Sequence, residues 1–181
     1  MEKDQALELA RNSQTDAEML ASLAGQHIAV DRALACHPNA TGELLESLIY
    51  AEDEAGNFDR TVRASVVSHP NVTSGNFAEL ACLYPEAAVR NPSLMQLVAV
   101  NASLLWRCGQ LLEQPACPVG LIELAFESDS HSTMFPALRN PNLPEPLRQR
   151  LGPATLYAEA ETLLDEFEAA QVDELTRSYV R

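Results

Sequence analysis

One short motif that ends helices recurs along this chain at a nearly regular interval. His-Pro-Asn-x-Thr occurs twice, at 37–41 and 69–73. With four related pairs it forms a series: Asn12-Ser13, His37-Pro38, His69-Pro70, Asn91-Pro92, Gln114-Pro115 and Asn140-Pro141. The second residues of these anchor pairs are 25, 32, 22, 23 and 26 positions apart, and the acidic insertion "AEDEAGNF" at 51–58 accounts for the longest gap. Such a period is typical of solenoids whose units contain two short elements.

The chemistry of the anchor pair predicts a break between two helices. Proline has no backbone N–H and disfavours helical geometry at the residue before it, so the first helix of each unit should end there. Thr15, Thr41 and Thr73 follow as candidate N-caps of a second helix. The next apolar residues recur at i, i+1, i+4 and i+5, which predicts one buried stripe per helix. A single pair of helices cannot cover such a stripe, so the units are expected to stack.

Four units carry a family resemblance. The segments "ACHPNATGELLESLI", "VSHPNVTSGNFAELA", "ARNSQTDAEMLASLA" and "ALRNPNLPEPLRQRL" resemble the bacterial leucine-rich repeat variant family, and the resemblance spans residues 6–152. It implies a right-handed superhelix in which a short 3₁₀ helix alternates with an α-helix. Some members of that family hold an iron–sulfur cluster on N-terminal cysteines. This chain has no cysteine before Cys36, so no cofactor is expected.

These observations predict an all-α solenoid with two parts. Residues 1–153 should form about six short two-helix repeats. After Gly152-Pro153 the repeat stops, and residues 154–181 combine one apolar stripe with many acidic residues. This segment is predicted to be an amphipathic helix that either caps the last unit or docks onto a partner.

The net charge indicates which class of partner the chain can bind, and the cysteine spacing indicates the compartment. The chain has 26 acidic and 12 basic residues, a formal charge of −14, so nucleic acids and anionic membranes should be repelled. A basic protein partner fits better. The four cysteines show no C-x-x-C spacing and are expected to be small buried thiols in a reducing compartment. Without a secretion signal or an apolar span at the N-terminus, a cytoplasmic location is predicted.

The sequence supports a repeat architecture more strongly than it supports a metal-binding or catalytic site. His37 and His69, with Cys36 nearby, could bind zinc, but other units have Asn or Gln at the same place, which favours a helix-ending role. The "SDSH" segment at 128–131 is expected to be a polar loop, because a catalytic triad depends on spatial geometry. The insertion at 52–59 lacks the spacing of a calcium loop and is predicted to be solvated. The chain also contains N-glycosylation sequons, but they are not expected to be glycosylated in a cytoplasmic protein.

The predicted function is a non-catalytic protein–protein interaction scaffold. The alternative is an acidic inhibitor or immunity-type protein that blocks a basic partner. Residues of the long insertion and two large aromatic residues are the candidate partner contacts: Glu52, Asp53, Glu54, Asp59, Tyr84 and Trp106. The sequence predicts neither an enzyme nor an oligomeric state.

Overall fold

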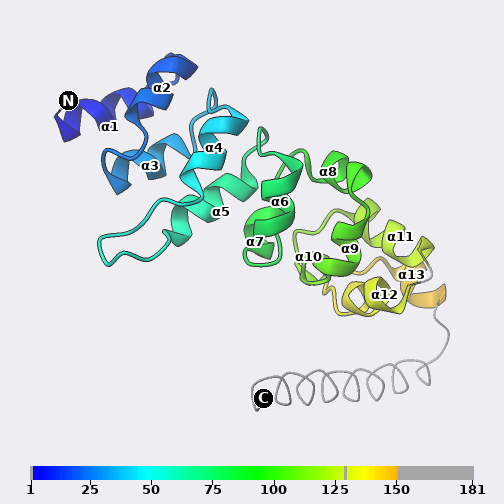
Figure 1. Cartoon of the computed structure of the whole chain (residues 1–181). Coiled ribbons are helices and arrows are strands. Elements are labelled where there is room, and N and C mark those ends of the chain that lie inside the picture. The colour runs from blue at the N-terminus through cyan, green and yellow to red at the C-terminus, as the bar shows by residue number, and fades with distance from the viewer. Residues whose placement is uncertain (1, 129, 151–181) are drawn as a thin grey trace, which may run out of the picture.

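The computed structural model describes residues 2–128 and 130–150, and this part of the chain is helical (Figure 1). Its helices are α1 (Lys3–Arg11), α2 (Ala17–Leu23), α3 (Ile28–Leu34), α4 (Gly42–Leu48), α5 (Arg60–Ser68), α6 (Ser74–Leu80), α7 (Pro85–Ala88), α8 (Leu94–Val100), α9 (Ser103–Arg107), α10 (Gln110–Glu113), α11 (Val119–Glu127), α12 (His131–Leu138) and α13 (Glu145–Arg150). The described part contains no strand and no 3₁₀ helix. The all-helical prediction is confirmed, whereas the implied 3₁₀ helices are α-helical here. The predicted C-terminal helix lies outside the described residues.

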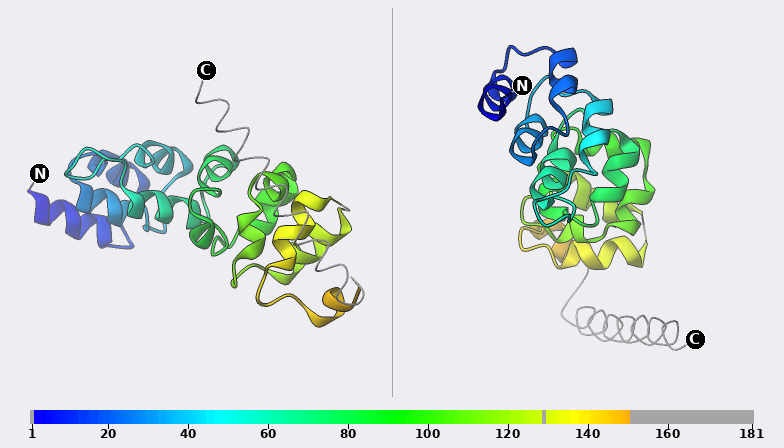
Figure 2. Two further views of the ribbon diagram at one scale, coloured as in Figure 1. Left: turned by 90° about the horizontal axis from the view of Figure 1, so that it is seen from below. Right: turned by 60° about the vertical axis from the view of Figure 1, so that its left-hand side comes forward.

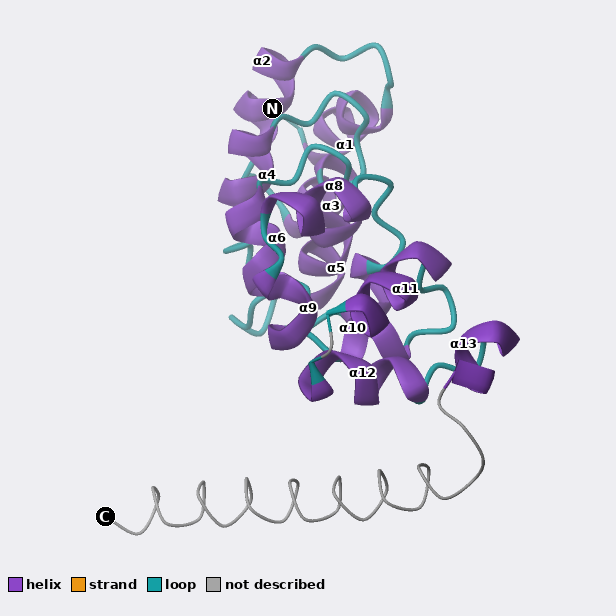
Figure 3. Cartoon of the chain, turned by 90° about the vertical axis from the view of Figure 1, so that its right-hand side faces the viewer, coloured by secondary structure: helices purple, strands orange, loops and turns teal. Residues whose placement is uncertain are grey.

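Each anchor pair lies between two helices, and we call these two helices together a unit. The helices before the anchors are α1, α3, α5, α7, α10 and α12, and we call them the first helices; α2, α4, α6, α8, α11 and α13 follow the anchors and are the second helices. Each first helix contacts the next one along this series. The series runs from the N-terminus to the far end of the described chain (Figures 1 and 2). The additional helix α9 lies between the fourth and fifth units, and loops join all these helices (Figure 3).

The apolar core is shared between neighbouring units. The largest completely buried side chains come from first helices, second helices, α9 and the end of α4: Leu20, Leu23, Leu34, Leu45, Ile49, Phe77, Leu80, Leu94, Leu104, Leu111, Leu112 and Leu121. Burial of one such side chain contributes about 1.5–3 kcal/mol. Because the first helices pack against their successors, the stability of each unit depends on its neighbours.

Side-chain caps begin three of the second helices. Thr41 and Thr73 accept hydrogen bonds from backbone N–H groups of α4 and α6, as predicted. The prediction for α2 was one residue off, because Asp16 is its cap and accepts from the Met19 N–H at 2.8 Å. Thr15 is instead buried, and its hydroxyl donates to the Leu9 carbonyl at 2.7 Å.

The prediction of four free, buried thiols was wrong in two respects. Cys82 and Cys108 form a disulfide between the turn after α6 and the end of α9, and Cys36 is exposed. Only Cys117 is both free and buried. The two bonded residues are 26 positions apart, about one repeat period, so stacking places them side by side where no local spacing motif could reveal the pair.

Candidate partner-binding surfaces

The anchor histidines link successive units through the backbone. His69 Nε2 lies 2.9 Å from the His37 carbonyl oxygen, and His37 Nε2 lies 2.9 Å from the Asn12 carbonyl oxygen. Each Nδ1 accepts from the backbone N–H two residues later, at 3.1 Å. A carbonyl only accepts and an N–H only donates, so both rings carry their proton on Nε2. Neither nitrogen is left for a metal or for proton transfer.

Asparagine makes the same two contacts at other anchors. The amide of Asn91 donates to the His69 carbonyl at 2.8 Å while its oxygen accepts from the Ser93 N–H at 2.7 Å. Asn140 likewise donates to the Gln114 carbonyl at 2.8 Å. We call this series the anchor ladder: Asn12, His37, His69 and Asn91, then Gln114 and Asn140. The alternation of His and Asn follows from this shared bonding, and it supports the architectural interpretation of the motif.

The anchor ladder is interrupted between the fourth and fifth units. The side chain of Gln114 donates to the Gln110 carbonyl in its own unit, at 3.0 Å, instead of reaching back to Asn91. The disulfide spans the same junction, because Cys82 precedes α7 and Cys108 precedes α10. A covalent link is therefore present where the hydrogen-bond link is missing.

The acidic insertion folds into a short hairpin. Glu52 and Phe58 form an antiparallel bridge, and the Asp53 carboxylate accepts from the N–H groups of Ala55 and Asn57 at 2.9 and 3.0 Å. Gly56 occupies the left-handed region with φ +78°, which favours glycine. Glu52 and Glu54 are exposed, so these two predicted contacts are accessible. The Asp53 carboxylate instead accepts hydrogen bonds within the turn.

Asp59, also predicted to contact a partner, is used within the fold. It is buried at 3% exposure, caps α5 by accepting from the Val62 N–H at 2.8 Å, and pairs with Arg32 at 2.6 Å. The hydrogen bond from the Arg32 side chain is the main cause that lowers the pKa of Asp59. The sequence could not show this role, because Arg32 lies 27 residues away.

Two aromatic side chains that the sequence analysis did not select lie at the base of the hairpin. The rings of Tyr50 and Phe58 meet edge to face, with centroids 6.4 Å apart, and they are 60% and 48% exposed. The guanidinium of Arg63 lies over the Phe58 ring, 4.0 Å from its centroid. Aromatic residues on both sides of an acidic insertion are the signal that could have identified this group.

The two aromatic residues predicted as contacts differ in exposure. Trp106, on α9, is 59% exposed. Tyr84 is partly buried against the core, just before α7. Figure 1 shows α9 well separated from the hairpin along the chain, so the predicted contacts do not form one cluster.

Basic residues are absent from the second helices of the first five units. Within the described residues, every Lys and Arg lies in or beside the first helices, in α9 or in α13. The exposed acidic residues of these second helices are Glu18, Glu43, Glu46, Glu79, Glu123 and Glu127. Exposed apolar side chains accompany them: Met19, Met95, Val119 and Leu124. The net charge of the chain does not reveal this segregation. A count of basic residues in each predicted helix would have revealed it.

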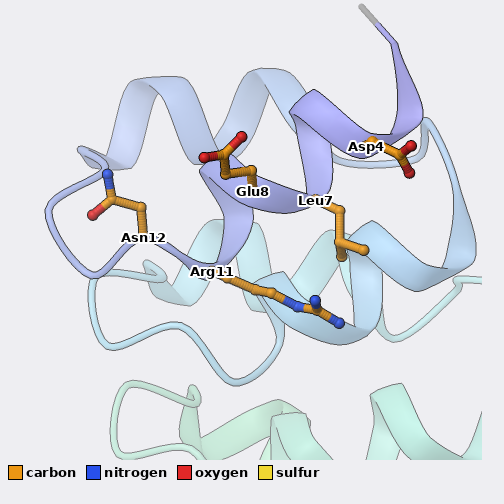
Figure 4. A pocket seen from close by; sticks show the side chains of 5 residues that line it. All are labelled: Asp4, Leu7, Glu8, Arg11 and Asn12. Carbon is orange, nitrogen blue, oxygen red and sulfur yellow. The ribbon is translucent and has the colours of Figure 1, made fainter.

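A shallow hollow of about 420 Å³ lies along α1 (Figure 4). Asp4, Leu7, Glu8, Arg11 and Asn12 line it. Figure 4 shows Asp4 and Asn12 at opposite ends of the helix and Glu8 pointing away from Arg11. Because the polar groups do not converge, we assign no site to this hollow.

The fold and its surfaces define a helical repeat domain. Residues 4–57 match the family model described as Leucine Rich Repeat Variant domain. This match covers the first two units and most of the hairpin, and it confirms the resemblance of those units. Neither the curated proteins nor the solved structures include a match to this chain. No described helix is long and apolar enough to cross a membrane.

Proposed function

We propose that this protein is a non-catalytic scaffold that binds a basic protein partner along the second helices of its first five units. The main support is the absence of Lys and Arg from those helices. An acidic surface steers and orients a basic partner, and exposed methionines adapt to irregular apolar contacts. A leucine-rich repeat variant domain suggests such an interaction scaffold.

The proposed form is a right-handed superhelical solenoid of six two-helix units. The contacts between successive first helices and the anchor ladder support this form. Residues 154–181 are proposed to be an acidic amphipathic helix that caps the last unit or docks onto a partner, as their sequence pattern indicates.

The proposal also covers the chemistry of the partner and the compartment. A charge of −14 disfavours nucleic acid and anionic membranes. Glu52, Asp53, Glu54, Tyr84 and Trp106 remain proposed contacts. A cytoplasmic location is proposed from the sequence, although the Cys82–Cys108 disulfide is an observation against a constantly reducing compartment.

An acidic inhibitor or immunity-type protein is the alternative, and the same charge segregation favours it. Such a protein would occupy the basic site of its partner with carboxylates. The two functions differ in their response to salt. Binding by charge alone weakens steeply as salt rises, whereas apolar docking changes little.

Affinity capture with charge-matched variants tests the proposal. The chain and its Glu43→Gln/Glu46→Gln variant are compared at low and high salt, with Glu8→Gln/Glu86→Gln as control, since all four side chains are exposed. We expect the α4 variant to lose its bound protein while the control retains it. Equal losses from both variants, or no bound protein at all, would contradict the proposal. The same capture without residues 154–181 shows whether that segment contributes.

A further inference from the structure

We propose that the hairpin between α4 and α5 binds an arginine side chain of a basic protein segment, with the Tyr50 ring and the Glu52 carboxylate as its contacts. Tyr50 is 60% exposed and Phe58 48% exposed, although both belong to a folded segment held by the Glu52–Phe58 bridge and the Asp53 turn. Large aromatic side chains that are both ordered and exposed are typical of binding surfaces.

The chain already places one guanidinium against this aromatic pair. Arg63 lies over Phe58 at 4.0 Å from the ring centroid, and its Nε donates to the Ile49 carbonyl at 2.8 Å. A ring face combined with an oxygen acceptor is a combination that suits arginine better than lysine. The exposed Tyr50 ring offers a second aromatic surface beside it.

The acceptor for a second guanidinium is Glu52. Residues directly opposite in an antiparallel pair, here Glu52 and Phe58, present their side chains to the same face, and the Phe58 ring contacts the Tyr50 ring. Glu52 is therefore expected on the side of the hairpin that carries Phe58 and Tyr50. Within the described residues, neither Glu52 nor Glu54 forms an ion pair.

The local charges favour a cation. Arg32 is paired with Asp59, and Arg63 is stacked on Phe58. Of the remaining groups, Arg60 is basic, whereas Glu52, Asp53 and Glu54 are acidic. This excess of negative charge, next to exposed rings, matches the charge and the planar shape of an arginine side chain.

The hairpin site deepens the proposed function and rests on it for the basic character of the partner, because Glu52 is among the contacts proposed there and here receives a specific ligand. Figure 1 shows the hairpin projecting beside α3 and α5. The pKa of Arg32 on α3 is raised mainly by its hydrogen bond to Asp59, and the charges of Glu54 and Asp53 also raise it. The partner surface proposed above lies on the second helices. The capture experiment tests the second helices and the peptide titration tests the hairpin, so failure of one proposal can be distinguished from failure of the other.

A peptide titration tests the hairpin site on the full chain. The probe is a labelled peptide of alternating glycine and arginine, and its citrulline counterpart, which keeps the shape without the charge, is the reference. We expect the arginine peptide to shift the NMR signals of Tyr50 and Phe58. Tyr50→Leu and Glu52→Gln should each weaken its affinity by about 2–5-fold, while the citrulline peptide binds no variant measurably.

Glu86→Gln is the matched control, because it removes the same charge from an exposed position on α7, outside the second helices and the hairpin. An equal loss of affinity in Glu86→Gln and Glu52→Gln would show general attraction to an acidic protein and overturn the site. Unchanged affinity of Tyr50→Leu, or signal shifts confined to other helices, would overturn it as well. Circular dichroism verifies that both hairpin variants are folded, and the shifts in the unaltered chain decide the question if one is not.

Discussion

At the scale of single residues, the anchor side chains do more than end helices. His37, His69, Asn91 and Asn140 each accept from the backbone N–H two residues later. Each also bonds the preceding unit: the histidines contact one carbonyl there and the asparagines donate to two. A buried amide or imidazole in this place therefore satisfies groups that would otherwise lose their hydrogen bonds in the interior. The residue type matters less than its ability to donate with one atom and accept with another.

Substitution of His69 tests this equivalence. His69→Asn should change the free energy of unfolding by less than about 1 kcal/mol, because Asn91 shows that asparagine can make both contacts. His69→Ala should lower it by about 2–4 kcal/mol, since the Asn71 N–H would lose its acceptor and the His37 carbonyl one of its donors. Urea denaturation measures both variants. Equal destabilisation by Asn and Ala would show that only ring packing matters.

Asp59 and Asp31 should respond to pH in opposite directions. The Arg32 side chain lowers the pKa of Asp59, so its stabilising effect is present above the unfolded-state pKa of about 3.9 and is lost as pH falls through the lower folded-state pKa. Burial raises the pKa of Asp31, so its ionised form costs stability as pH rises above that same unfolded-state value.

Denaturation of two asparagine variants at neutral pH and at pH ~3 checks the signs of these two effects. At neutral pH Asp59→Asn should be less stable than the unaltered chain and Asp31→Asn equally or more stable, since an asparagine oxygen can still accept from the Gly25 N–H. Both differences should shrink at the lower pH. A stability difference that grows on acidification would refute the direction given for that aspartate's pKa shift.

At the scale of elements, the caps, the hairpin and the disulfide show where sequence reasoning succeeds. Thr41 and Thr73 were predicted as caps because a cap and its helix are adjacent in sequence. The Arg32–Asp59 pair and the Cys82–Cys108 bond join residues about one unit apart. Such contacts depend on how units stack, and the anchor ladder itself uses backbone carbonyls, which every residue has. The helical fold was therefore predictable, and the individual contacts between units were not.

Reduction of the disulfide should destabilise the chain. In the chain-entropy model, closing a loop of 26 residues contributes about 3.5 kcal/mol to the free energy of unfolding. A reducing agent should therefore lower the midpoint of urea denaturation, and Cys82→Ser/Cys108→Ser should abolish this response. Cys36→Ser serves as control because Cys36 is exposed and forms no disulfide.

Thiol counting supplies an independent check. In the native, oxidised chain only the exposed Cys36 should react rapidly, because burial raises the pKa of Cys117 to about 11 and keeps its thiol protonated. Denaturation should expose the Cys117 thiol, and reduction should release the remaining pair. Rapid reaction of all four cysteines in the native state would show that the disulfide does not form in solution.

At the scale of the whole molecule, the segregation of charge has an energetic cost. A net charge of −14 repels itself in the compact state, and the second helices of the first five units contain no basic residue that could relieve it. Salt screens such repulsion with a Debye length of about 10 Å at 0.1 M. The free energy of unfolding should therefore rise with added sodium chloride.

The Glu43→Gln/Glu46→Gln variant provides the comparison for this effect. With fewer like charges on α4, it should be more stable at low salt and should gain less from added salt than the unaltered chain. Denaturation with urea, which is uncharged, measures both. Stability that falls as salt rises would mean that pairs such as Arg32–Asp59 outweigh the repulsion.

The interruption of the anchor ladder between Asn91 and Gln114 determines how the chain should respond to mechanical force. Under tension applied to its ends, an array of stacked units parts first at its weakest junction, and here the inter-unit anchor hydrogen bond is absent. The Cys82–Cys108 bond crosses that junction and would carry the load. A pulling experiment should accordingly show one early extension in the reduced protein that is missing in the oxidised one.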